Sequence, residues 1–272
     1  MAARPRVDGG RKGCAMSTKP RGLSAVDLKL AMRQPSCPIC RIRDEAEYRY
    51  LYFLLWENVN DGTTRMQIVN SLGFCPKHTW QMGRIETKNF GDAFGNSIIY
   101  ENLVEIVRDR LTRYVHRTQA KQRSRWQGYL DRLLRRPQRL PFPAELQPQA
   151  ICRVCQTGEQ SERSHVHWLL QGLSVPEPDF RDWYTQSERL CFRHLRLALE
   201  LADPETEAGA MFLARDATEY LDRLRVDLDE YGNKHAWDRR FEEMTESEKV
   251  SWLKAFIFFG GNERNENGHR PK

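Results

Sequence analysis

The sequence predicts an all-α protein of two tandem helical repeats, each stapled by a metal site of three cysteines and one histidine, with a C-terminal helix. Apolar residues in the long segments recur at steps of three and four, which is the helical period, and almost no segment alternates like a strand. The same metal-ligand motif occurs twice, which indicates an internal repeat. A helical lobe of about 100 residues has a modest core, so a stabilising metal is expected.

The metal-ligand motif is CxxC followed by CxxH. The first copy is Cys37-Pro-Ile-Cys40 with Cys75-Pro-Lys-His78, and the second is Cys152-Arg-Val-Cys155 with Cys191-Phe-Arg-His194. The gaps between the two halves are 34 and 35 residues, and the two copies hold all cysteines of the chain except Cys14. Three thiolates and one imidazole are a common ligand set for tetrahedral zinc. The sequence therefore predicts two zinc ions per chain.

A shift of 115 residues aligns the two copies beyond the ligands. It places residues 50–55 (YLYFLL) on residues 165–170 (HVHWLL), and a shift of 116 places His78 on His194. We predict a disordered basic tail over 1–22, repeat one with its metal site over 23–136, and a Pro-rich linker over 137–150. Repeat two, with its own metal site and the C-terminal helix, is expected over 151–261, and a disordered tail over 262–272.

Helix starts are marked by capping residues. Pro38 and Pro76 each follow a ligand cysteine, which indicates that these pairs open helices whose N-terminal partial charge stabilises thiolates. Asp203-Pro204 predicts a cap with proline at the first helical position, and Thr245 with Glu248 predicts a capping box. Four tryptophans among apolar residues are expected in the core: Trp56, Trp80, Trp183 and Trp252.

We expect each ion to be held within one repeat. The alternative is an exchange of ligand pairs between the repeats, which requires closure across the Pro-rich linker and is disfavoured. Four protein ligands leave no position for water, so a hydrolytic metal is not expected. A thiol-redox protein, an iron–sulfur protein and an enzyme with a site hidden in the sequence remain alternatives. His165 and His167 align with Tyr50 and Tyr52, which favours aromatic packing over metal binding.

Positive charge is segregated along the chain. Of the net charge of +6, residues 1–22 carry +5 and residues 108–139 carry +9, which leaves −8 for the rest. Because aromatic residues interleave with the second basic segment, it predicts a surface for nucleic acid or an acidic protein, the alternative being a solvated helix face. The predicted contacts are Arg113, Arg117, Lys121, Arg123, Arg125, Arg132, Arg135 and Arg136. The favoured function is a non-enzymatic interaction module.

The sequence also bears on location. No apolar stretch approaches the roughly 20 residues that span a bilayer, and residues 256–259 (FIFF) are expected to form the buried face of a last helix. Residues 1–22 lack the apolar region of a secretory signal. Cysteines arranged as metal ligands then point to the reducing cytoplasm.

Three segments resemble an uncharacterised family of bacterial helical proteins with repeated CxxC and CxxH sets. They are the two ligand segments of the first copy, 37–40 and 73–78, and the run SWLKAF at 251–256 followed by Gly260-Gly261. The resemblance covers roughly residues 35–261. It implies the same metal ligands position by position and implies no catalytic residue. The second copy departs from the pattern with Arg153 and Phe192 in place of prolines.

Overall fold

The computed structural model describes residues 23–122, 143–175 and 178–262. These residues form helices and connecting turns without a strand, which confirms the all-α prediction. Within these ranges no helix is both long enough and apolar enough to cross a membrane. The predicted tail 1–22, most of the predicted tail 262–272 and residues 137–142 of the predicted linker lie outside the described residues.

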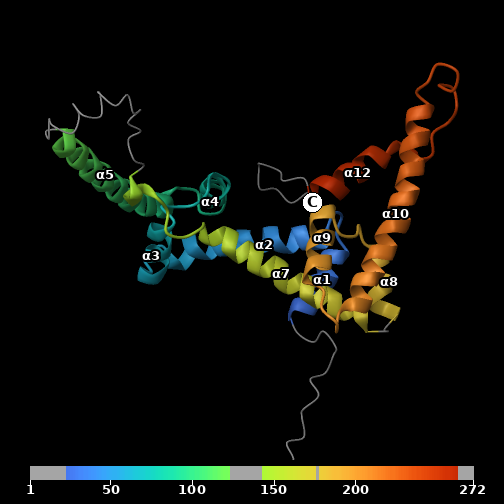
Figure 1. Ribbon diagram of the computed structural model, residues 1–272, viewed down its shortest axis with the longest axis horizontal. Coiled ribbons are helices and arrows are strands. Elements are labelled where there is room, and N and C mark those ends of the chain that lie inside the picture. Colours follow the sequence, from blue (N-terminus) through green and yellow to red (C-terminus); the bar gives the residue numbers. More distant parts are fainter. Residues whose placement is uncertain (1–22, 123–142, 176–177, 263–272) are drawn as a thin grey trace, which may run out of the picture.

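The described residues of the first half, 23–122, form five α-helices and one π-helical turn (Figure 1). Their bounds are α1 Leu23–Met32, α2 Pro38–Phe53, the π-helical turn η1 Leu54–Asn58, α3 Gly62–Asn70, α4 Pro76–Asn89 and α5 Phe94–Gln122. The second half begins with a 3-10 turn. Its elements are η2 Ala144–Leu146, α7 Arg153–Ser174, α8 Pro178–Gln186, α9 Phe192–Leu201, α10 Glu207–Asn233, α11 Glu246–Lys249 and α12 Ser251–Gly260.

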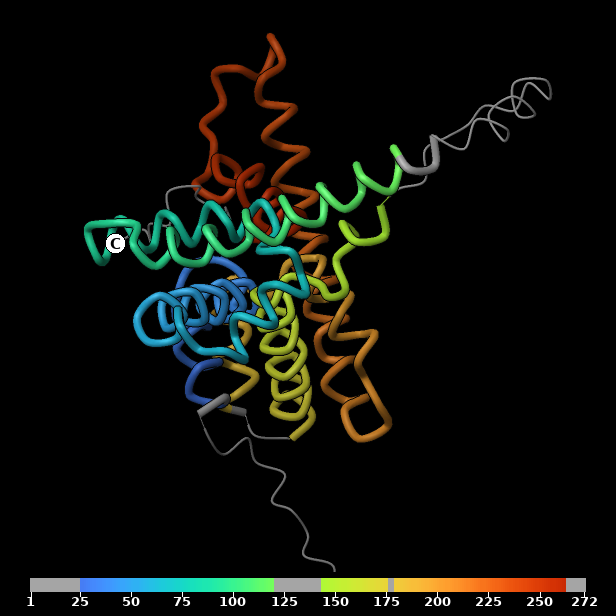
Figure 2. Tube along the Cα trace, turned by 90° about the vertical axis from the view of Figure 1, so that its left-hand side faces the viewer, coloured from blue at the N-terminus to red at the C-terminus, as the bar shows by residue number. Residues whose placement is uncertain are grey.

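Helices α2 and α7 lie side by side at the centre of the molecule (Figures 1 and 2). They run in opposite directions, because Arg43 contacts Glu162 while Glu47 lies against Gly158. Helices α3, α4 and α5 lie at one end of this pair, and α1, α8, α9, α10 and α12 lie at the other end. Helix α5 projects away from the body.

The apolar core consists of two clusters, and each combines both halves of the chain. One contains Leu28 and Ile39 from the first half with Val166 and Leu213 from the second. The other is built mainly from the first half, around Leu51, Met82 and Ile99, but includes Cys152 and Val154 at the start of α7. The two sequence repeats therefore do not each form a separate core.

Most predicted helix starts are correct. Pro38 and Pro76 open α2 and α4, and Thr245 and Glu248 form the predicted capping box of α11. The prediction at Asp203-Pro204 is wrong, because α10 begins at Glu207. The Asp203 carboxylate instead accepts hydrogen bonds from the backbone N–H groups of Glu205 and Thr206 and closes a turn ahead of the helix.

The aromatic residues are more exposed than the sequence predicts. Trp80 is 70% and Trp56 60% exposed, and Trp252 is also exposed, so only Trp183 packs against a core. In α12 the side chain of Phe258 is buried, whereas Phe256 and Phe259 are exposed. Apolar composition does not distinguish a core position from an apolar surface position, and this is why the expectation fails here.

Candidate metal centres

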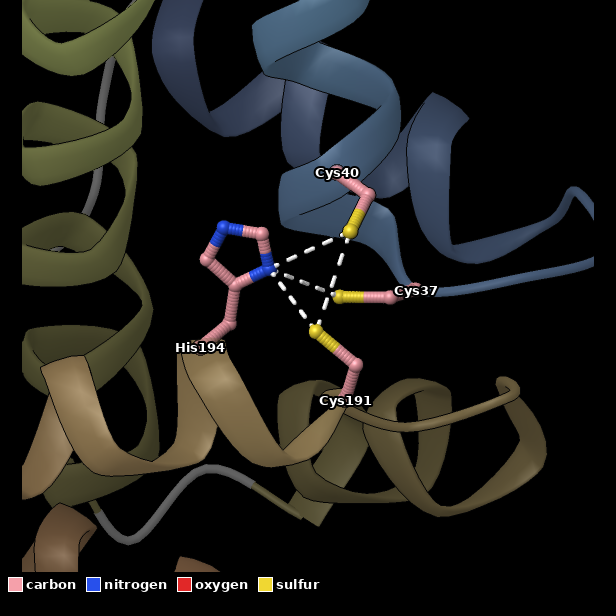
Figure 3. Close-up of side chains that lie close together, drawn as sticks. All are labelled: Cys37, Cys40, Cys191 and His194. Atoms are coloured by element: carbon pink, nitrogen blue, oxygen red, sulfur yellow. Dashed lines mark hydrogen bonds between the residues drawn. The ribbon is translucent and has the colours of Figure 1, made fainter. Parts of the chain in front are cut away.

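Two groups of three cysteines and one histidine can each hold a metal ion. The α2–α9 site consists of Cys37, Cys40, Cys191 and His194, and Figure 3 shows these side chains converging on one point. The α4–α7 site consists of Cys75, His78, Cys152 and Cys155. All eight predicted residues belong to these two groups, but the prediction that each site lies within one repeat is wrong. Each CxxC pair meets the CxxH pair of the other half of the chain.

The α2–α9 site has the dimensions of a tetrahedral metal centre. Nδ1 of His194 lies 3.3, 3.3 and 3.2 Å from the sulfurs of Cys37, Cys40 and Cys191. The sulfurs of Cys40 and Cys191 are 3.7 Å apart. A tetrahedral zinc ion at its usual bond lengths separates two sulfurs by about 3.8 Å and a sulfur from a nitrogen by about 3.6 Å. The side chains thus stand close to the positions that one ion requires.

The α4–α7 site repeats this geometry. Nδ1 of His78 lies 3.2, 3.5 and 3.4 Å from the sulfurs of Cys75, Cys152 and Cys155. The sulfurs of Cys75 and Cys155 are 3.7 Å apart. None of the six cysteines in the described residues forms a disulfide. In each site the four ligand atoms lie within 4.8 Å of one another.

Both sites are assembled from helix N-termini. The first cysteine of every pair is the residue that caps a helix: Cys37 of α2, Cys75 of α4, Cys152 of α7 and Cys191 of α9. The partial positive charge at a helix N-terminus favours thiolates, and each site receives it from two helices. Gly73 and Arg189, each two residues before the cap of a CxxH helix, have positive φ angles of 95° and 61° and turn the chain into that helix.

The length and direction of α2 explain why the ligand pairs are exchanged. A helix of 16 residues is about 24 Å long, so α2 carries the chain far from Cys37 and Cys40. The following CxxH pair lies near the far end of α2. Because α7 is antiparallel to α2, its N-terminal CxxC pair lies at that same end. The exchange therefore follows from helix geometry.

A model of one protein family matches nearly the whole chain. The chain belongs to the DUF6062 family. This family has no known function, and the match covers residues 25–264. A relative, an uncharacterised 23.9 kDa protein in the xynA 3' region of Caldicellulosiruptor sp. (strain Rt8B.4), is 21% identical over 231 residues, which is 85% of this chain and 98% of the relative. No solved structure matches.

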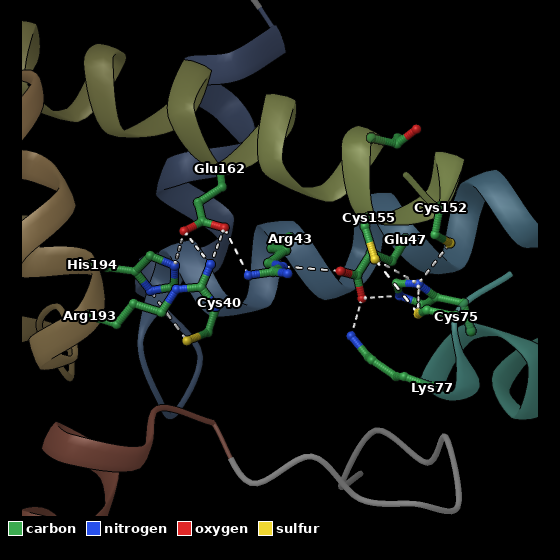
Figure 4. Close-up of polar contacts among 12 residues, drawn as sticks. Cys40, Arg43, Glu47, Cys75, Lys77, Cys152, Cys155, Glu162, Arg193 and His194 are labelled. Atoms are coloured by element: carbon green, nitrogen blue, oxygen red, sulfur yellow. Dashed lines mark hydrogen bonds and ion pairs between the residues drawn. The ribbon is translucent and has the colours of Figure 1, made fainter. Parts of the chain in front are cut away.

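A buried glutamate lies behind the histidine of each candidate site in this DUF6062 chain, and Figure 4 labels Glu47 and, beside His194, Glu162. Oε2 of Glu47 lies 3.1 Å from Nε2 of His78, and Oε1 of Glu162 lies 3.1 Å from Nε2 of His194. The sequence analysis missed these residues. A signal was present, because each glutamate follows the second cysteine of a CxxC pair by seven residues, at Cys40 and Cys155.

Arg43 links the two glutamates. Its Nε lies 3.0 Å from Oε1 of Glu47, and its Nη1 lies 3.0 Å from Oε2 of Glu162. The residue before each histidine adds a further cation: Lys77 contacts Glu47, and Nη2 of Arg193 lies 3.0 Å from Glu162. A continuous buried chain of charges therefore joins the two candidate metal centres.

These contacts shift the pKa values of the side chains in the site. Burial disfavours the charged form of His78, but Cys152 and Glu47 outweigh it and raise the pKa of His78 to about 9. Burial likewise opposes ionisation of Glu47, but His78 and Lys77 lower the pKa of this carboxyl to about 2. The pKa of Cys152 falls to about 6 despite burial, because His78 and backbone N–H groups stabilise its thiolate. The thiolate of Cys152, the form that binds metal, is thus favoured before any ion arrives, whereas burial and the neighbouring Cys152 charge raise the pKa of Cys155 to about 12.

Gly261, the residue that follows α12, packs against the α2–α9 site. A Cβ at Gly261 would stand 2.9 Å from the sulfur of Cys40 and 3.7 Å from the sulfur of Cys191. The backbone of Gly261 has φ 75° and ψ −154°, a conformation that side chains disfavour. Glycine at this position therefore allows the end of α12 to approach the thiolates closely.

The predicted partner contacts are only partly described. Arg113 and Arg117 lie exposed on α5, where Arg117 forms an ion pair with Glu145, and Lys121 lies in the last turn of the same helix. The other five lie outside the described residues: Arg123, Arg125, Arg132, Arg135 and Arg136. His165 and His167 belong to neither metal group, and Nδ1 of His165 lies 2.7 Å from the carbonyl oxygen of Ser161.

Proposed function

We propose that the protein binds two zinc ions per chain and uses them structurally, to clamp the two halves of the chain together. The observation that carries this proposal is the convergence of three sulfurs and one nitrogen within 4.8 Å in each site. Each ion would join two helix N-termini from different halves of the chain. Structural zinc supplies on the order of 10 kcal/mol of apparent folding free energy in small domains.

The ligand geometry favours zinc over the alternatives. An iron–sulfur cluster distributes its cysteines over several irons, which separates the sulfurs, whereas here all ligands converge on one point. A thiol-redox protein needs a reactive cysteine that is free of a ligand set, but all six described cysteines sit in a complete set; three of them are buried and the other three only partly exposed. Four protein ligands also leave no open position for a catalytic water.

Metal analysis tests the proposal. Protein purified without added metal should contain two equivalents of zinc, be colourless, and lose helical circular dichroism when a strong chelator removes the ions. A purified chain with iron and inorganic sulfide in place of zinc would favour the cluster alternative. Metal removal that leaves thermal unfolding unchanged would contradict the structural role.

We further propose that the clamped fold presents a basic surface to a polyanion, with nucleic acid as the first partner to test and an acidic protein as the second. In the described residues, support comes from α5, which projects from the body and carries exposed arginines at 108, 113 and 117. Part of this positive charge is compensated within the helix, since the guanidinium of Arg108 lies 2.8 Å from the carboxylate of Asp109. The segregation of charge over residues 108–139 supplies the remaining support.

A salt titration tests the nucleic-acid partner. Affinity for single- or double-stranded DNA or RNA should fall steeply with salt concentration, because each neutralised phosphate releases counterions. Charge reversal at Arg113 and Arg117 should weaken binding to all sequences about equally. The matched control is charge reversal at Arg223 and Arg225 of α10, which lie outside the basic segment. Absence of binding at low salt would exclude nucleic acid and leave the acidic protein.

A further inference from the structure

Each buried glutamate contacts the histidine of the site to which its own helix gives no ligand. Glu47 lies on α2, whose cysteines belong to the α2–α9 site, yet it contacts His78 of the α4–α7 site. Glu162 lies on α7, whose cysteines belong to the α4–α7 site, yet it contacts His194 of the α2–α9 site. All four side chains are buried.

We propose that Glu47 and Glu162 are reciprocal positioning residues and that Arg43 couples the two metal sites through them. Each glutamate would hold the histidine of one site while its helix is anchored by the metal of the other site. This inference rests on the proposed metal binding. It adds that the two sites are filled cooperatively. It also adds that the histidine of each site is held by a glutamate from the helix that gives cysteines to the other site.

The orientation of the histidine rings supports the positioning role. In both rings Nδ1 faces the three sulfurs, and Nε2 faces the carboxylate. When Nδ1 binds a metal, Nε2 carries the ring proton, and the carboxylate 3.1 Å away stabilises it as an ion-pair contact, although the geometry is not that of a hydrogen bond. A carboxylate behind a metal-bound histidine fixes the tautomer and the ring orientation and raises the basicity of the ligand.

The position of Arg43 supports the coupling. One planar guanidinium contacts both glutamates at 3.0 Å, which a single ammonium group is poorly shaped to do. Position 158 lies 115 residues after Arg43, the same offset that relates Glu47 to Glu162, and it is a glycine. A Cβ there would stand 2.7 Å from Oε1 of Glu47. The interface thus has room for one arginine, and this arginine contacts the glutamates behind both histidines.

Cooperativity follows from this crossed arrangement. Metal in the α2–α9 site fixes the N-terminus of α2 and with it Glu47, which then holds His78 ready for the second ion. The converse holds for metal in the α4–α7 site, α7 and Glu162. Coupling between binding sites is reciprocal by thermodynamic necessity, so either site filled first should raise the affinity of the other.

Two variants that each retain only one complete metal site test the positioning role. Cys75→Ser leaves only the α2–α9 site complete, and Cys191→Ser leaves only the α4–α7 site complete. In the first background Glu162→Gln should weaken zinc binding by about 10- to 100-fold, measured by competition with a chromophoric chelator, while Glu47→Gln has little effect. In the Cys191→Ser background, Glu47→Gln should weaken zinc binding and Glu162→Gln should have little effect. Larger effects of each variant on the site of its own helix, or equal effects on both sites, would overturn the inference.

Two further measurements use the chain with both sites intact. In the zinc-loaded protein, Glu47→Gln should move the NMR signal of the Nε2 proton of His78 and leave that of His194 in place, and Glu162→Gln should do the reverse. This readout remains informative if a single-site protein does not fold. Arg43→Lys should reduce the cooperativity of zinc binding, whereas Arg84→Lys on the exposed surface of α4 should not.

Unmoved proton signals or unchanged cooperativity would each count against the inference. If the wild-type chain binds no metal, the proposed function itself fails. If it binds two zinc ions and the glutamate variants match the wild type, only the inference fails.

Discussion

Gly158 of α7 lies directly against Glu47 of α2, and a Cβ at this glycine would stand 2.7 Å from Oε1 and 3.0 Å from Cγ of the glutamate. The contact lies at the centre of the antiparallel helix pair, between the two candidate metal centres. The absence of a side chain at position 158 therefore sets both the distance between the helices and the place of the carboxylate behind His78.

Gly158→Ala should destabilise the protein despite the higher helix propensity of alanine. The added methyl group must displace Glu47 or separate α2 from α7, and such overpacking costs about 1 to 3 kcal/mol. Gly83→Ala is the matched control, because Gly83 also lies within a helix, α4, but a Cβ there meets nothing within 4 Å. Denaturant unfolding of the metal-loaded proteins should show a loss of stability for the first variant and a small gain for the second. Equal changes in both would show that the contact is not tight.

Double ligand variants test which cysteines share an ion. Cys37→Ser with Cys191→Ser removes two ligands of one site, so the protein should retain about one equivalent of zinc. Cys37→Ser with Cys75→Ser removes a ligand from each site, so metal content should fall well below one equivalent. Elemental analysis of the purified proteins distinguishes the two. Grouping of the ligands within each repeat requires the opposite pattern and would contradict the observed pairing.

Gly261→Ala should weaken the α2–α9 site selectively. The new methyl group would stand 2.9 Å from the Cys40 sulfur, and alanine disfavours the positive φ of this position. Gly260→Ala is the neighbouring control, since a Cβ at Gly260 meets nothing within 4 Å. Chelator-induced zinc release should become faster for one of the two ions in Gly261→Ala and stay unchanged in Gly260→Ala. Faster release of both ions would instead indicate general loosening of the fold.

The sequence was sufficient to predict the eight side chains that form the two candidate metal groups and the starts of α2 and α4. The prolines after Cys37 and Cys75 and the repeated spacing are local signals, and the helix N-termini follow from them. The pairing was not predictable in this way, because it depends on the length of α2 and on its antiparallel packing with α7. Glu47 and Glu162 were visible as a repeated offset from the cysteines. Their contacts with the histidines depend on the packing, which places each glutamate behind the histidine of the other site.

The capping box of α11 gives the protein a titratable contact away from the metal centres. Nζ of Lys234 lies 2.8 Å from Oε2 of Glu248, and this contact, together with the backbone N–H of Thr245, holds the pKa of Glu248 below its ordinary value. A carboxyl whose pKa is lower in the folded state stabilises that state above its unfolded pKa, near 4.3. This contribution is lost as the pH falls from that value through the lowered folded pKa.

Glu248→Gln should therefore reduce stability at neutral pH and make little difference at the acid end of this window. Glutamine can retain the capping hydrogen bond to Thr245 but cannot pair with Lys234. The check is the difference in unfolding free energy between the wild type and the variant, measured at matched metal content from pH 7 downward. A difference that stays constant with pH would assign the effect to packing instead of to the ionised carboxylate. Thr245→Val, which removes the hydroxyl cap but leaves the ion pair, should lower stability by about 1 kcal/mol at every pH.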